Sequence, residues 1–426
     1  MNTNTDKIDN NVPKIQKVPD FGDKESDLLM YKYVPLKMPK KAPLVVVLHG
    51  CGESYNAAGL ASYAKNTGWI KYADKLGFAL ILPTQYKETD LLSKALLRSE
   101  GMEEITIDPA SLLKMFSDWL TAIEKAGFAQ TNGLRVQVKA LLEAPLNGPE
   151  KTLSALISGL FTEVNGLGAL LRSGGVEMME GYSKIVGLNP MRCFQFYNPE
   201  RRRRQATSIL RMVQKMEEDY KIDEQQIYVT GLSGGAAMTP VMLALCPETF
   251  AGGATIAGLP YGCADNAIAG IECMKGKNNS GTTPDTAEKW GDLVRNADTI
   301  DFKKSTDKKP RISIWQGGVD PLVNRLNANE LVEQWTNFHG ISTSVDSDTG
   351  GFLGQEIVDD VAVHRKYGRK VGGKEEVLVE SYTVIDMPHG LAVDPLNGCG
   401  ERAPFILDFG ICSTSYICKF WGLERV

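Results

Sequence analysis

The stretch Ile227–Met238, "IYVTGLSGGAAM", decides the fold of this chain of 426 residues. Its β-branched, apolar start predicts a buried strand, and its alanine-rich end predicts a helix. The pattern G-x-S-x-G between them is typical of a nucleophile elbow, a sharp turn that lifts Ser233 out of the fold while Gly231 and Gly235 let the backbones pass. An ordinary glycine-rich turn has the same pattern, so the rest of the chain must decide between the two.

Buried strands alternate with helices on both sides of this stretch. "APLVVVLHG" at 42–50 and residues 78–82 predict two strands, with a helix between them that ends at Gly77. The pattern continues with a helix from Pro199, strands in 251–259, 311–318 and 376–387, and a helix through 327–335. This alternation predicts an α/β fold with a mostly parallel sheet flanked by helices.

The alternation stops between 87 and 187, where helical stretches occur without a convincing strand. We therefore expect a polar N-terminal segment with lead-in strands at 1–40, a catalytic domain formed by 41–86 and 188–426, and a helical insertion at 87–187 that serves as a lid or cap. The alternative for the insertion is an accessory domain whose helices pack on one another and on the sheet and have no role in substrate binding.

Composition excludes several classes of partner. With 43% hydrophobic residues, 23% charged residues and a net charge of -5, the chain is unlike a nucleic-acid binder. No apolar run approaches the roughly 18 to 20 residues that span a bilayer. The N-terminus lacks the apolar region of a secretory signal, so two compartments stay open: secreted if the chain is a mature form, cytoplasmic if Met1 is the native start. The oligomeric state is left open as well.

The eight cysteines do not have the spacing of a zinc site. No two of them form C-x-x-C, so we expect no metal, and we expect no other cofactor. Disulfides fit an oxidising compartment, whereas reduced and buried thiols fit the cytoplasm. The sequence leaves the pairing open.

A serine nucleophile needs a base to remove its proton and an acid to orient that base. In the α/β-hydrolase fold these residues follow in the order nucleophile, acid, histidine. This order selects His389, in a loop after a predicted strand, from the four histidines. It selects Asp320, which follows the buried strand "RISIWQGG", as the acid. Asp386 and Asp394 are competitors, although a strand end and a turn explain them equally well.

An ester hydrolase also needs two backbone N–H groups that stabilise the oxyanion. The turn "LHGCGES" follows the first strand of the β-α-β unit, at the place of the loop that contributes one such group. Cys51 is the predicted donor from this turn, and Gly234, directly after the serine, is the second. A tight turn without this role is the alternative.

At this point the chain resembles the polyhydroxybutyrate depolymerase family of esterases, which includes feruloyl and acetylxylan esterases. The resemblance rests on seven segments, in order: "LVVVLHGCGES", "TGW...AD..GFALILPTQ", "NPMRCFQFYNPE", "YVTGLSGGAAM", "GLPYGCA", "WQGGVDPLVN" and "APFILDFGICSTSYICKFWGL". It implies the α/β-hydrolase fold, a metal-free triad of Ser233, Asp320 and His389, and Cys51 at the oxyanion turn. It favours the elbow reading of the opening stretch.

The chain departs from the family at three places. Gln195 and Phe196, predicted substrate-binding residues, stand where asparagine and tryptophan are common. The helical block replaces a short loop, and we expect no linker or polymer-adsorbing domain after "FWGLERV". We expect a serine ester hydrolase that cleaves polyhydroxyalkanoate polymer or oligomers. The alternatives are a carboxylesterase of feruloyl or acetylxylan type or for small esters, and a non-catalytic protein that binds polyester granules.

Overall fold

The computed structural model describes residues 14–24, 26, 28–51, 56–85, 192–276, 286–304, 306–344 and 350–424. The chain divides into two compact units, one formed by Met1–Gln85 with Cys193–Val426 and the other by Tyr86–Arg192. Apart from Arg192, the second unit lies outside the described residues, and so does the insertion predicted at 87–187. The described fold is therefore that of the first unit.

The first unit is built on a ten-stranded sheet, counted over the described residues. Its order is β1-β2-β4-β3-β5-β6-β7-β10-β9-β8. The six strands from β4 to β10 in this order are parallel to one another, and β1, β2, β9 and β8 pair antiparallel at the two edges. The bounds are β1 Gln16–Val18, β2 Leu28–Tyr33, β3 Ala42–Leu48, β4 Ala79–Gln85, β5 Ile222–Leu232, β6 Gly252–Ile256, β7 Arg311–Gly317, β8 Gly351–Val358, β9 Ala362–Val371 and β10 Lys374–Val384.

A smaller parallel pair, β11 Leu391–Val393 and β12 Ile406–Asp408, follows the large sheet in the chain. The described helices are α1 Ala57–Asn66, α2 Trp69–Leu76, α9 Pro199–Asp219, α10 Gly234–Leu245, α11 Ala267–Met274, α12 Ala287–Arg295, α13 Leu326–His339, α14 Ser413–Phe420 and the 3-10 helix η1 Pro395–Asn397. Among these helices, none combines the length and the apolar character needed to cross a bilayer.

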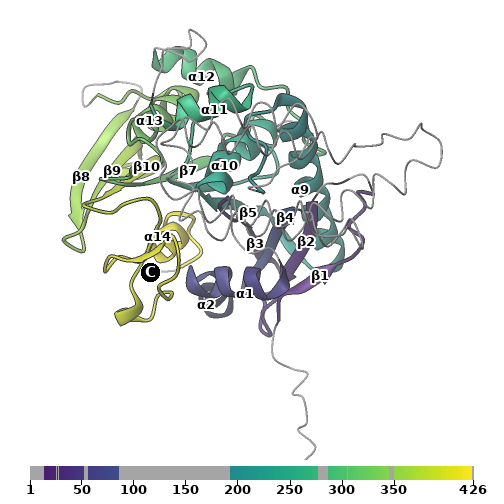
Figure 1. Ribbon diagram of the computed structural model, residues 1–426. Coiled ribbons are helices and arrows are strands. Elements are labelled where there is room, and N and C mark those ends of the chain that lie inside the picture. The colour runs from purple at the N-terminus through teal and green to yellow at the C-terminus, as the bar shows by residue number, and fades with distance from the viewer. Residues whose placement is uncertain are drawn as a thin grey trace, which may run out of the picture. The chain divides into compact units, whose positions relative to one another are not determined.

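Helices cover both faces of the sheet because side chains alternate along each strand. Leu44 and Val46 of β3 pack in one hydrophobic cluster with residues of α9, α10 and α13. Val45 and Val47 pack in a second cluster with residues of α1, α2 and α14. Figure 1 shows these two groups of helices on opposite sides of the central strands. The central strands are therefore buried on both faces, as their continuous apolar sequences predict.

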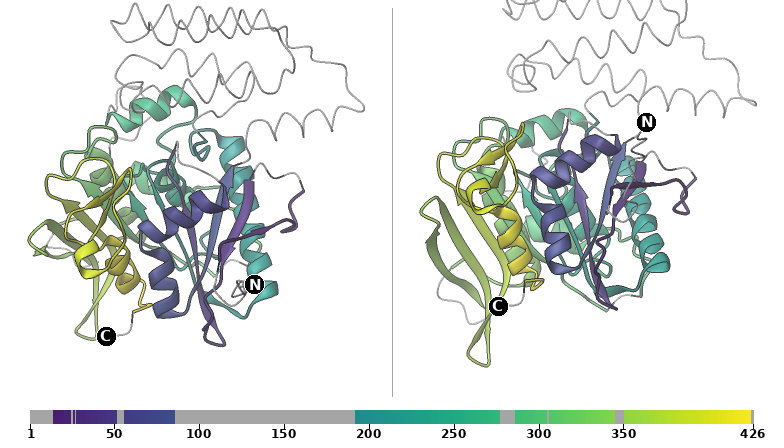
Figure 2. Two further views of the ribbon diagram at one scale, coloured as in Figure 1. Left: turned by 60° about the horizontal axis from the view of Figure 1, so that its bottom comes forward. Right: turned by 90° about the horizontal axis from the view of Figure 1, so that it is seen from below.

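The predicted fold class is confirmed, since the sheet is mostly parallel and flanked by helices. The antiparallel strands β8 and β9 were not predicted from the sequence. They extend the sheet at the edge opposite the N-terminal strands β1 and β2, as both views of Figure 2 show. β9 contains the charged run "HRKYGRK", in which Arg369 and Lys370 are exposed while His364 and Tyr367 are buried, so it lacks the apolar pattern of a buried strand.

Candidate active site

The turn between β5 and α10 holds Ser233. Ser233 precedes the first residue of α10 and has φ 54° and ψ -116°. A residue other than glycine with positive φ is uncommon, and such strain is typical of the nucleophile position in a strand-to-helix elbow. Its N–H donates to the carbonyl of Ile256 on the neighbouring strand β6 at 3.0 Å. The predicted strand, turn and helix are therefore all present.

The two glycines of the motif are needed because backbone segments meet there. A Cβ on Gly231 would lie 2.3 Å from the carbonyl carbon of Gly235. A Cβ on Gly235 would lie 2.5 Å from the carbonyl oxygens of Leu48 and His49, at the end of β3. Backbone atoms cannot move aside as a flexible side chain can, so any larger residue would force the elbow apart.

Asp320 and His389 form a hydrogen-bonded pair. Asp320 follows β7, and His389 follows β10, the parallel neighbour of β7. His389 Nδ1 lies 2.8 Å from Asp320 Oδ2. The Asp320 side chain has no exposed surface, and 5% of the His389 side chain is exposed. Since Ser233 follows β5 in the same parallel set, all three residues lie at the carboxyl edge of the sheet.

Both carboxylate oxygens of Asp320 accept further hydrogen bonds. Oδ1 accepts from the backbone N–H groups of Leu322 and Val323, at 2.8 and 2.9 Å. Oδ2 accepts from Gln316 Nε2 at 2.9 Å, in addition to its contact with His389. The carboxylate is thus fixed from both sides, and because a carboxylate accepts hydrogen bonds, this contact favours the His389 tautomer with its proton on Nδ1.

Neither competing acid has a hydrogen bond to His389 among the described residues. Asp394 caps η1, because its Oδ1 accepts from the N–H of Asn397 at 3.2 Å. Asp386 lies just beyond the end of β10 with φ 56°. Of the three candidate carboxylates, Asp320 is the one that the structure joins to His389.

The remaining histidines make structural contacts. His49 lies between the carbonyl of Gly50 and the hydroxyl of Thr84. His339 contacts the carbonyl of Pro310, and burial lowers its pKa to about 4. His364 lies on β9 with Nε2 2.9 Å from Glu380 Oε2.

Cys51 lies beside the start of α10, as an oxyanion donor should. A Cβ on Gly234 would lie 2.5 Å from Cys51 Sγ and 3.7 Å from its backbone nitrogen. A disulfide joins Cys51 to Cys193 and ties the turn after β3 to the segment before α9. The first N–H groups of a helix have no partner within the helix, so that of Gly234 is available to an anion. The two predicted donors are therefore neighbours.

The predicted substrate-binding residues differ in exposure. Gln195 is 4% exposed, and its backbone N–H donates to Gln205 Oε1 at 2.9 Å. It therefore holds the segment after Cys193 in place. Phe196 is half-buried, packs against the cluster between α10, α11 and α12, and meets the ring of Tyr197 edge to face at 5.1 Å.

No hydrogen bond within the described part of the chain joins the Ser233 hydroxyl to His389 Nε2. Contacts between nucleophile and base are often long without substrate and tighten when it binds. The described residues also contain no cluster of three or more His, Cys, Asp or Glu side chains suited to a metal ion.

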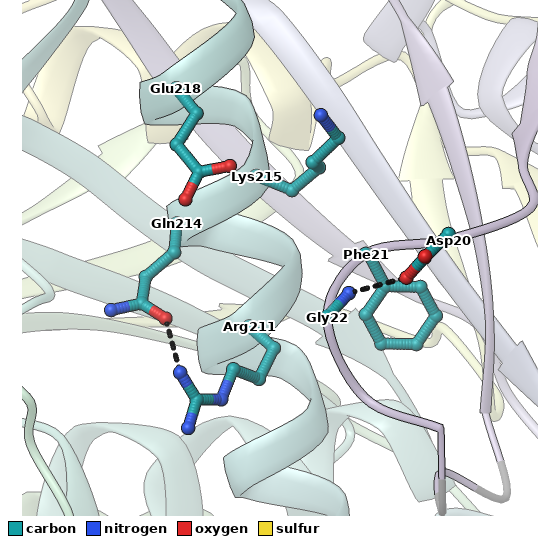
Figure 3. Close-up of a pocket in the computed structure, with 7 residues that line it drawn as sticks. All are labelled: Asp20, Phe21, Gly22, Arg211, Gln214, Lys215 and Glu218. Carbon is teal, nitrogen blue, oxygen red and sulfur yellow. Dashed lines mark hydrogen bonds between the residues drawn. The ribbon is translucent and has the colours of Figure 1, made fainter.

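A surface hollow of about 370 Å³ lies away from Ser233, Asp320 and His389, and none of these three residues lines it. It lies between the segment at 20–22 and α9 (Figure 3), and its lining residues are Asp20, Phe21, Gly22, Arg211, Gln214, Lys215 and Glu218. These side chains include no serine, cysteine or histidine. The hollow therefore offers no nucleophile with a base beside it.

Sequence reasoning missed two residues near this site. Gln316, the side-chain donor to Asp320, sits at the end of β7, where an amide four residues before the acid could have been noticed. Phe405 meets His389 edge to face, with ring centroids 5.9 Å apart. Nothing in the local sequence indicates that contact.

The sequence is similar to a depolymerase and to an esterase. Residues 183–358 match the family described as Esterase PHB depolymerase, a range that contains Ser233 and Asp320. The chain is 41% identical over 245 residues to poly(3-hydroxyalkanoate) depolymerase C of Paucimonas lemoignei, covering 56% of this chain and 54% of that protein. It is 33% identical over 151 residues to feruloyl esterase B of Talaromyces stipitatus, covering 34% of this chain and 40% of that protein.

The chain thus spans about half of the length of these curated relatives. Among solved structures, an acetyl xylan esterase from Aspergillus awamori aligns with a TM-score of 0.55 at 16% identity, over 96% of this chain and 99% of that one. At this identity the likeness supports the fold alone.

Proposed function

We propose that the chain is a serine ester hydrolase acting on polyhydroxyalkanoate polymer or oligomers, from the premise that residues 183–358 match the esterase PHB depolymerase family. The observation that carries the proposal is the 2.8 Å contact between His389 Nδ1 and an Asp320 carboxylate with no exposed surface, at the sheet edge that also carries the strained Ser233. This is the set of groups that activates a hydroxyl nucleophile.

The reaction proceeds through an acyl-enzyme. His389 Nε2 takes the hydroxyl proton as Ser233 Oγ attacks the ester carbonyl, and Asp320 stabilises the imidazolium. The N–H groups of Cys51 and Gly234 stabilise the oxyanion. The C–O bond then breaks, and His389 returns its proton to the leaving alcohol. Water, activated by His389, hydrolyses the acyl-enzyme and restores Ser233.

The acyl part of the substrate is proposed to contact Phe196, while Gln195 sets the shape of that wall from beneath. Phe196 presents a half-buried ring, whereas the nearly complete burial of Gln195 leaves little of it for substrate. An apolar wall suits the short alkyl branches of a polyhydroxyalkanoate.

The test compares Ser233→Ala with the wild-type chain on p-nitrophenyl butyrate. Loss of the nucleophile should lower kcat at least about 10³-fold with an unchanged circular dichroism spectrum, because a triad member is removed and one hydroxyl is lost from packing. Ser344→Ala, at an exposed serine, is the matched control and should keep full activity. Residual activity above about a tenth in Ser233→Ala would reject this nucleophile.

Polymer film separates the substrate classes. Release of 3-hydroxybutyrate from the film supports a depolymerase. Activity on methyl ferulate or acetylated xylan without release from film would favour the esterase alternative, which the similarity to feruloyl esterase B supports. Binding to film by a wild-type chain that hydrolyses no ester would favour a granule-binding protein.

A further inference from the structure

Phe405 is fixed beside His389 by the small pair β11 and β12. In their parallel register, Leu391 lies opposite Ile406. The N–H of Leu391 donates to the carbonyl of Phe405 at 2.8 Å. Phe405 directly precedes β12, and His389 lies two residues before β11, so both residues lie at the start of two paired strands. A disulfide between Cys399 and Cys412 braces the same segment.

The Phe405 ring meets the imidazole of His389 edge to face, with centroids 5.9 Å apart and an interplanar angle of 77°. Despite this contact the residue is 36% exposed. Its φ of 59° lies in the left-handed region, an outlier for a bulky side chain. Such conformations persist where the surroundings fix them, and they cluster at ligand sites.

A second exposed apolar residue borders the same loop. Val319, next to Asp320, is 57% exposed, and its N–H donates to the carbonyl of Met387 at 3.1 Å. Both members of the acid–base pair thus carry an exposed apolar neighbour. Transfer of apolar surface from water to an apolar environment is favourable, so a substrate that covers these side chains binds more tightly.

Resting on the proposed function, we propose that Phe405 contacts the leaving alcohol of the ester and determines its chain-length specificity. His389 gives its proton to the alcohol oxygen, so that oxygen must come within hydrogen-bond reach of Nε2. The alkyl group attached to this oxygen then extends over the surface beside the imidazole. Phe405 lies on this surface, with its ring against His389. In a polyester this alkyl group belongs to the next hydroxyacyl unit of the chain.

The experiment varies the alcohol with the acyl group held constant. Acetate esters of methanol, butanol and hexanol are hydrolysed by wild type, Phe405→Ala, Phe405→Leu and Phe405→Tyr. Each methylene buried contributes up to about fourfold in kcat/KM. Phe405→Ala should lower the hexyl-to-methyl ratio of kcat/KM at least about fivefold, Phe405→Leu should lower it less, and Phe405→Tyr should preserve it. Leu396→Ala, at a 93% exposed leucine of η1 in the same segment, should leave it unchanged.

A second series varies the acyl group with p-nitrophenol as the common leaving group, and its ratios should be the same in Phe405→Ala and wild type. An equal loss on all esters, or a change in the acyl series instead, would overturn the inference. If wild type hydrolyses none of these esters, both the proposed function and the inference about Phe405 are rejected. A wild type that is active but indifferent to alcohol length rejects the Phe405 role alone. Should Phe405→Ala not fold, the Phe405→Leu ratio decides.

Discussion

The two halves of the candidate active site are held by different forces. At the end of β5, Ser233 is placed by backbone segments that meet at Gly231 and Gly235, and its side chain has no cap hydrogen bond. Around Asp320 and His389, by contrast, loops are placed by hydrogen bonds to both carboxylate oxygens. The position of the nucleophile depends on steric contacts between backbone segments, and the position of the acid–base pair depends on hydrogen bonds.

This difference predicts how each half fails. Steric contacts between backbones are lost together with the fold, whereas a polar contact can be removed with the fold kept. Substitutions of the elbow glycines Gly231 and Gly235 should therefore change stability first, and isosteric substitutions around Asp320 should change activity first.

The largest effect is expected for Asp320→Asn. The amide keeps the size of the carboxylate but favours the wrong tautomer of His389, so kcat should fall on the order of 10⁴-fold. Asp394→Asn is the matched control, because Asp394 caps η1 and should change kcat by less than about threefold. Kinetics on p-nitrophenyl butyrate decide between them, and a greater loss in Asp394→Asn would mean that the acid is misassigned.

A smaller effect, on stability, is expected for Gly235→Ala. Its Cβ would meet two backbone carbonyl oxygens at 2.5 Å, which should lower the free energy of unfolding by about 3 kcal/mol or more. Gly340→Ala, at φ 67° with no atom within 4 Å, introduces backbone strain alone and should cost about 1 kcal/mol. Urea unfolding measures both, and equal losses would remove the steric account of the elbow.

The smallest effect is expected for Thr230→Val, one residue before Gly231. The Thr230 hydroxyl is buried and has no hydrogen-bond partner in the described structure, so an isosteric methyl should change the free energy of unfolding by less than about 0.5 kcal/mol or stabilise the fold. Thr414→Val removes a buried 2.6 Å bond to the carbonyl of Thr67 and should cost about 1 kcal/mol. A larger loss in Thr230→Val than in Thr414→Val would show that the elbow depends on polar contacts after all.

Local patterns in the sequence were enough to predict much of the fold. The strand, the glycines and the alanine-rich helix around Ser233 are neighbours in the chain, so their geometry follows from residues a few positions apart. The buried strands β3, β4 and β7 were predicted for the same reason, because continuous apolar runs require cover on both faces. Chain order then placed Asp320 and His389 after strands of one sheet.

Contacts between distant segments were decided by the tertiary structure. The 2.8 Å contact joins residues 69 positions apart, and it distinguishes Asp320 from Asp386 and Asp394, which are far closer to His389 in the sequence. The pairing of Cys51 with Cys193, across 142 positions, is of the same kind. So is the register of β11 against β12, which brings Phe405 to the imidazole. A residue type and its neighbours fix local backbone geometry, but a contact between remote side chains depends on how whole strands pack, and no short pattern records that packing.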